Sequence, residues 1–94
     1  MTHKRGFQVD DLLEQLADKE HASWGRWMVY LFETCQQNPD GSVTIPAALV
    51  ERWDRQANTP YAELSEREKE SDRDEVRHIL PLIEAALQTR NAVS

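Results

Sequence analysis

Tryptophan and arginine residues lie next to one another at two places in this sequence. The first group is Trp24, Arg26 and Trp27, and the second is Arg52, Trp53 and Arg55. An aromatic ring beside a guanidinium group can stack on a purine while the guanidinium binds a phosphate. The same residue types are enriched at protein–protein hot spots. An aromatic stripe at helical spacing is also typical of a core, with the arginines on the outer faces of the helices, so both interpretations stay open.

The reactive side chains are not arranged for catalysis or metal binding. Cys35 has no histidine within one helical turn, and Ser23 follows His21 by a spacing that does not place both on one helix face. The three histidines lack the spacing of a zinc-binding helix. The carboxylates between residues 63 and 75 alternate with basic residues at three- and four-residue spacing, which is typical of an ion-paired helix exterior. We therefore expect no enzyme, no catalytic residue, no metal site and no cofactor.

The composition indicates a small acidic protein. The 94 residues suit one domain, 1–94, and the formal net charge of −6 disfavours binding to duplex nucleic acid, which requires a basic face. No apolar run approaches the ~20 residues that cross a bilayer, and the first residues become acidic too early for a signal peptide. The lone cysteine fits a reducing compartment. We expect a soluble, cytoplasmic protein that binds neither duplex nucleic acid nor membranes.

The N-terminal half of the sequence has the apolar periodicity of helices. Leucines and a valine recur at helical spacing over 8–19, and a more aromatic series follows over 23–37. Ser23 is a possible N-cap between the two series, so we predict a break near 20–23. The alternative is one long helix that continues through Ala22. A turn at 38–42, with the sequence Asn-Pro-Asp-Gly-Ser, ends this half of the chain.

Two further helices are expected after that turn. An extended connector leads into a helix over 46–57, which ends at Asn58 as a left-handed cap before Thr59 and Pro60. Ser65 and Glu68 then form a capping box at the start of the last helix. Pro81 lies inside the apolar stripe of this helix and predicts a kink or break near 78–81.

The sequence therefore predicts an all-α domain of three to four helices with short loops. We expect an aromatic core built mainly from the helices after residue 23. Loose ends are expected at 1–7 and 90–94.

A motif over 59–83 resembles the ryanodine-receptor repeat. Its hallmark positions are Pro60, Tyr61, Leu64, Glu68, Lys69, Asp72 and Arg73. The other segments of a full repeat have no counterpart upstream, so their ligand roles are not carried over. The resemblance implies a non-enzymatic interaction or ligand-binding unit, with purine nucleotides among the suggested ligands of the family. The capping box and a loop–helix corner are also a sufficient structural reason for the motif, which leaves Lys69, Asp72 and Arg73 for binding.

Over nearly its full length the chain is similar to a group of small proteins encoded by bacteriophages and prophages. The residues that carry this likeness include Trp24, Trp27-Met28, Tyr30-Leu31-Phe32, Ile45-Pro46, Val50, Arg52-Trp53 and Arg55-Gln56. The resemblance implies a phage accessory protein that acts in the cytoplasm of a bacterial host and has no catalytic role.

Our leading hypothesis is a non-enzymatic binding protein that engages a host protein. The alternatives are a homo-oligomeric sponge for a nucleotide-type signal of bacterial anti-phage defence, and an acidic mimic of nucleic acid. The candidate binding residues are Arg26, Arg52, Trp53, Arg55, Tyr61, Lys69, Asp72 and Arg73.

Overall fold

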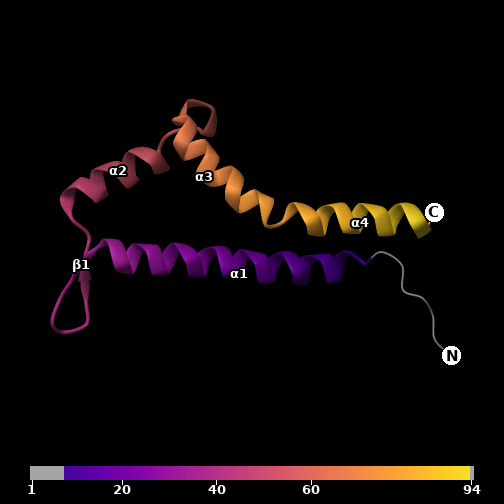
Figure 1. The fold of residues 1–94 in the computed structure, drawn as a ribbon, viewed down its shortest axis with the longest axis horizontal. Coiled ribbons are helices and arrows are strands. Elements are labelled where there is room, and N and C mark those ends of the chain that lie inside the picture. The colour runs from indigo at the N-terminus through magenta and orange to yellow at the C-terminus, as the bar shows by residue number, and fades with distance from the viewer. Residues whose placement is uncertain (1–7, 94) are drawn as a thin grey trace.

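The computed structural model describes residues 8–93, so the loose end predicted at 1–7 and residue 94 lie outside the described residues. Within this range the helices are α1 (Val9–Thr34), α2 (Ala47–Ala57), α3 (Glu66–Arg77) and α4 (Leu80–Val93). The predicted all-α class is confirmed. Figure 1 shows that α1 runs along one side of the molecule and that α2, α3 and α4 return along the other. As a result, α4 lies antiparallel beside the N-terminal half of α1.

A single helix covers the region in which we expected two. α1 is continuous from Val9 to Thr34, so the break predicted near 20–23 is wrong and the alternative of one long helix is correct. Ser23 lies in the middle of α1 and caps no helix. The residues around the expected break are compatible with a helix, and a single glycine, Gly25, costs only about 1 kcal/mol relative to alanine. Helical propensity therefore outweighs one possible capping residue.

The turn predicted at 38–42 is confirmed, and it closes a short hairpin. β1 (Gln36–Gln37) pairs antiparallel with β2 (Val43–Thr44), so the expected extended connector supplies the second strand. Gly41 has a φ of 90°, a conformation that favours glycine. Hydrogen bonds from the following serine to the carboxylate of Asp40 hold the turn and lower the pKa of that carboxyl group.

α2 confirms the helix predicted over 46–57, with Pro46 at the N-cap position. The left-handed cap predicted at Asn58 is wrong, because this residue has a φ of −97°. Its side-chain amide donates a hydrogen bond to the carbonyl oxygen of Asp54, which caps the helix without left-handed backbone. Of the face expected to be buried, Val50 is exposed and Trp53 is half-buried.

The start of α3 has the predicted capping box. A short 3-10 turn, η1 (Tyr61–Glu63), follows Pro60 and leads into it. The hydroxyl of Ser65 accepts a hydrogen bond from the backbone N–H of Glu68, and the Glu68 carboxylate accepts one from the backbone N–H of Ser65. Two amide groups that the helix start would leave unpaired are therefore satisfied.

The break predicted near 78–81 is also confirmed. α3 ends at Arg77 and α4 begins at Leu80, with Pro81 in its first turn, where the missing N–H of proline is tolerated. The loose end predicted at 90–94 is wrong as far as Val93, because α4 continues to that residue. None of the helices within residues 8–93 combines the length and the apolar character needed to span a bilayer.

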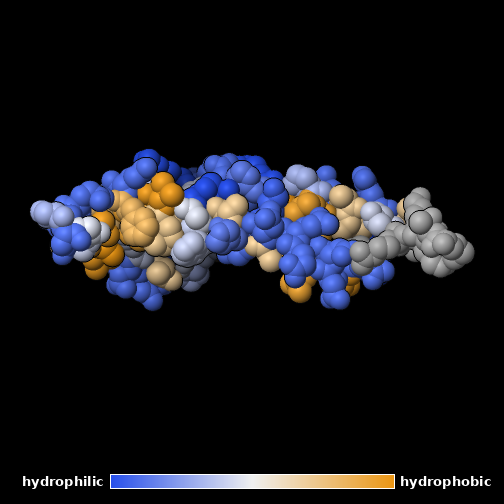
Figure 2. Space-filling model, turned by 90° about the horizontal axis from the view of Figure 1, so that it is seen from below, coloured by the Kyte–Doolittle hydropathy of each residue, from blue (hydrophilic) through white to orange (hydrophobic). Residues whose placement is uncertain are grey.

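Residues 8–93 do not enclose a hydrophobic core. Cys35, which is 5% exposed, is the only buried hydrophobic residue in the described part of the chain. The radius of gyration is 19.0 Å, against about 12 Å for a compact chain of this length. The predicted aromatic core is therefore wrong: the helices meet along single edges, and apolar side chains reach the surface at both ends of α1, as Figure 2 shows.

Candidate functional site

A cleft of about 520 Å³ lies where α1, α2 and α3 come together. It is lined by Ser23, Arg26, Trp27 and Tyr30 of α1, by Arg52, Trp53 and Gln56 of α2, and by Arg67, Glu68, Ser71, Asp72 and Glu75 of α3. We call it the Trp–Arg cleft. The fold thus brings together four of the eight predicted binding residues, namely Arg26, Arg52, Trp53 and Asp72, from three separate helices.

Three aromatic rings join α1 to α2 in this cleft. The ring centroids of Trp27 and Trp53 are 5.2 Å apart in an edge-to-face arrangement, and Tyr30 lies 6.4 Å from Trp53. Such pairs add about 0.5–1.5 kcal/mol each to the energy of burying the rings. Trp27 and Tyr30 are nevertheless 43% and 41% exposed. The rings therefore hold α2 in place and still present aromatic surface to a ligand.

Arg26 and Arg55, two of the predicted binding residues, each pair with a glutamate on another helix. The Arg26 guanidinium of α1 donates hydrogen bonds to the carboxylate of Glu75 on α3. Arg55 of α2 donates to the carboxylate of Glu68 on α3, at 2.9 Å. These bonds hold the pKa of each glutamate below its usual value. The two ion pairs connect α1 and α2, respectively, to α3, so these two arginines position the walls of the cleft.

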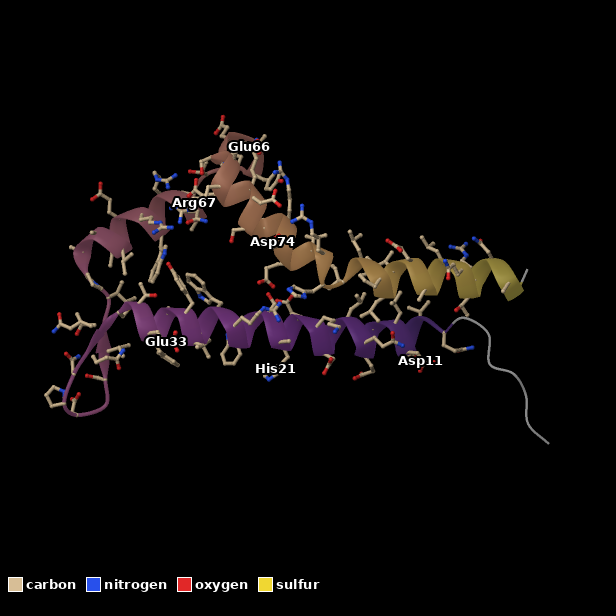
Figure 3. All side chains as sticks on the ribbon, viewed as in Figure 1. Asp11, His21, Glu33, Glu66, Arg67 and Asp74 are labelled. Atoms are coloured by element: carbon tan, nitrogen blue, oxygen red, sulfur yellow. The ribbon has the colours of Figure 1, made fainter. Side chains whose placement is uncertain are left out.

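The side chains of Arg52 and Arg67 make no ion pair or hydrogen bond with any residue within 8–93. They come from α2 and α3, and Figure 3 shows Arg67 where these two helices meet. Because Glu68 and Glu75 are engaged by other arginines, Asp72 is the one carboxylate of the lining without an arginine partner. The lining of the Trp–Arg cleft carries as many arginines as carboxylates, so it is neutral as a whole in a chain whose net charge is −6, and the guanidinium groups of Arg52 and Arg67 are the ones that no carboxylate engages.

The residues of the ryanodine-receptor-like motif lie mostly on another side of α3. A second hollow, of about 320 Å³, is lined by Tyr61, Asp72, Arg73, Val76, Arg77 and Leu80. The Lys69 ammonium lies 5.8 Å from the centre of the Tyr61 ring, and Arg73 forms ion pairs with Glu66 and Glu70. Only Asp72 lines both hollows. The Pro60–Tyr61 corner and the Trp–Arg cleft are therefore two separate features.

Sequence reasoning did not select every residue of the cleft. We interpreted Arg67 as part of an ion-paired charge run, named Trp27 in the first tryptophan–arginine group without selecting it as a binding residue, and gave Tyr30 no binding role. The missing signal was the helical spacing of residues 67, 68, 71, 72 and 75, which places them on one face of α3. Trp24, in contrast, does not line the cleft; it stacks on His21 and is 56% exposed.

Chemically, the Trp–Arg cleft offers aromatic faces, two unpaired guanidinium groups, and the hydroxyl and amide groups of Ser23, Ser71 and Gln56. These groups suit recognition of an anion that carries a planar ring. No group of three or more metal-binding side chains occurs in the part of the chain that the structure describes.

No model of a known protein family matches the chain, and comparisons with curated proteins and with solved structures find no significant match. The resemblance of 59–83 to the ryanodine-receptor repeat, and of the whole chain to small phage proteins, stays a prediction.

Proposed function

We propose that this chain is a small non-enzymatic binding protein of phage or prophage type, whose Trp–Arg cleft takes up a nucleotide-type anion. The observation that carries the proposal is the pair of unpaired arginines, Arg52 and Arg67, beside the partly exposed rings of Trp27 and Tyr30. A planar base stacks on such rings, and phosphate oxygens accept the paired N–H bonds of guanidinium groups.

The size of the cleft supports the same proposal. Its volume of about 520 Å³ lies within the range of roughly 300–1,000 Å³ that is typical of small-molecule sites. The cross-helix ion pairs of Arg26 and Arg55 fix the walls before a ligand arrives, which lowers the entropic cost of binding. In a phage setting, such a site serves to sequester a nucleotide signal of the host's defence.

The test is a thermal-shift and calorimetry series with cyclic dinucleotides and ADP-ribose derivatives. A ligand at a hundred times its Kd stabilises the folded state by about 2.7 kcal/mol, a shift of roughly 10 °C or more for a chain of this size. Arg52→Ala and Arg67→Ala should each weaken binding at least tenfold. The matched control is Arg90→Ala, an exposed arginine of α4 outside the cleft, which should leave affinity unchanged. Absence of stabilisation by every compound at millimolar concentration refutes the nucleotide proposal.

A host protein is the second candidate partner, and one observation favours it. Trp24 is 56% exposed outside the cleft and stacks on His21, so it offers an aromatic anchor of the kind found at the centres of interfaces. A pulldown from host lysate should then recover one stoichiometric protein with the wild-type chain and lose it with Trp24→Ala. Recovery of the same protein by both chains, or of none, counts against this candidate.

A further inference from the structure

One side of the molecule carries an apolar surface that no part of the described chain covers. We call it the lateral face, and its residues are the exposed Val9, Leu13, Val76, Leu80 and Leu87 and the partly buried Ile83. Val9 and Leu13 of α1 are 68% and 60% exposed, and Leu87 of α4 is 53% exposed. These positions are neither in the Trp–Arg cleft nor part of the function proposed for it.

The helix geometry places these residues on the same side of the molecule. The edge where α1 meets α4 is marked by Leu12 and Gln15 on α1 and by Leu82 and Ala86 on α4, which line a small hollow between the two helices. Successive residues are about 100° apart around a helix, so the apolar stripe of each helix lies roughly 100–140° around the helix axis from that edge. In both helices the rotation from the edge to the stripe follows the direction of increasing residue number. Because α1 and α4 run antiparallel (Figure 1), both turns lead to the same side.

The spacing on this side is that of packed helices. Residues 80, 83 and 87 of α4 follow one another at intervals of three and four, and residues 9, 13 and 16 of α1 at intervals of four and three, whereas Val76 lies on α3, before the break at residues 78 and 79. These are the intervals at which side chains of one helix insert between those of a neighbour. The α1 stripe ends at Glu20, the next position in the series. The lateral face is therefore built to pack on another helical surface.

The exposed area of the chain is that of an open arrangement of helices. The chain exposes 7752 Å², whereas a compact chain of 10.9 kDa exposes about 5,600 Å². The excess belongs to the molecule as a whole, and on the lateral face Val9, Leu13, Leu80 and Leu87 are each between 42% and 68% exposed. A second copy that covers this face therefore removes apolar surface that a single chain leaves in water.

We propose that a second copy of this chain covers the lateral face and completes the hydrophobic core across a two-fold axis. With Cys35 as its one buried hydrophobic residue among those described, a lone chain lacks the interior that opposes the entropy of folding. The cover must consequently be present whenever the chain is folded, and a second copy meets that requirement. A two-fold axis sets the same apolar face against itself, so two helical hairpins pack as a four-helix layer.

The test is the mass in solution, measured by light scattering after size exclusion at micromolar concentration. The wild-type chain should have twice the 10.9 kDa of one chain, and Leu13→Glu and Leu87→Glu should each reduce the mass to that of one chain. The matched control is Val29→Glu on α1, where Val29 is 54% exposed but lies about 160° around the helix from Leu13. This variant should keep the dimeric mass.

A measurement on the wild-type chain alone tests the proposal even if the variants do not fold. Unfolding of a dimer depends on concentration, so a tenfold increase should raise the melting temperature by roughly 3–6 °C. A melting temperature that does not change with concentration, a wild-type mass of one chain, or a dimer that survives both substitutions overturns the proposal. A monomeric wild-type chain would leave the face to a partner of another kind.

Discussion

Trp53 is the side chain on which the position of α2 depends most, so its removal gives a sharp test of the fold. It is half-buried, with ring contacts to Trp27 at 5.2 Å and Tyr30 at 6.4 Å. Truncating a fully buried tryptophan to alanine costs about 3–5 kcal/mol. Because Trp53 keeps part of its surface in water, we expect roughly half of this cost, plus the loss of two aromatic contacts. Trp53→Ala should therefore lower the free energy of unfolding by about 2–3 kcal/mol.

The assay is urea unfolding followed by far-UV circular dichroism, at one fixed chain concentration. With a slope of about 1–1.5 kcal/mol per molar urea for a small domain, the midpoint should fall by roughly 1.5–2.5 M. The matched control is Val50→Ala on the same helix, where the side chain is 50% exposed and the change should stay within about 0.5 kcal/mol. If Trp53→Ala changes the midpoint no more than Val50→Ala does, the ring contacts do not hold α2 against α1, and the Trp–Arg cleft loses its structural basis.

Three further predictions follow from local structure. Ser65→Ala removes the hydroxyl that caps α3 and should lower the free energy of unfolding by about 1 kcal/mol, whereas Ser71→Ala on the same helix should change it little. Gly25→Ala and Gly41→Ala should change the free energy of unfolding in opposite directions. An added Cβ meets no atom within 4 Å at either site, but Gly41 has a φ of 90°. We expect a gain of about 0.5–1 kcal/mol at Gly25 in the helix and a loss of about 1 kcal/mol at Gly41 in the turn. Finally, the arginine partners lower the pKa of Glu68, Glu70 and Glu75 from the ordinary 4.5, so the stability they contribute is complete above that pH and is lost as the pH falls through the lower, folded-state values. The urea midpoint should accordingly stay constant between about pH 5 and 8 and decrease below about pH 4.5, and a midpoint that rises on acidification would contradict these ion pairs.

Local signals in the sequence predicted most of the helical fold. The capping box at Ser65, the turn around Gly41 and the break at Pro81 each depend on a few neighbouring residues, and each is present in the structure. The expected break near 20–23 failed for the opposite reason. Ser23 is a good capping residue, but a cap forms only where the helix has a reason to stop, and nothing in the neighbouring residues stops α1.

The arrangement of the helices was harder to predict, since it depends on pairs of residues far apart in the sequence. Sequence reasoning placed the aromatic residues in a core, because apolar spacing does not distinguish a side chain buried within one chain from one that awaits a ligand or a second chain. The link between Arg26 and Glu75 likewise joins residues 49 positions apart. Helical spacing alone gave no reason to pair them. The wall of the Trp–Arg cleft that the charged residues of α3 form could therefore not be predicted from the sequence.

The continuity of α1 connects the two surfaces that the structure leaves open. Leu13 of the lateral face and Trp27 of the Trp–Arg cleft lie on one uninterrupted helix, fourteen residues or about 21 Å apart. A second copy centred on Leu13 is therefore displaced along α1 from the rings of the cleft. Each chain of a two-fold dimer then keeps its own cleft, fixed by a helix that the dimer holds straight. A helix broken at 20–23 would have allowed these two surfaces to move independently, whereas the unbroken α1 couples the geometry of the cleft to the proposed dimer.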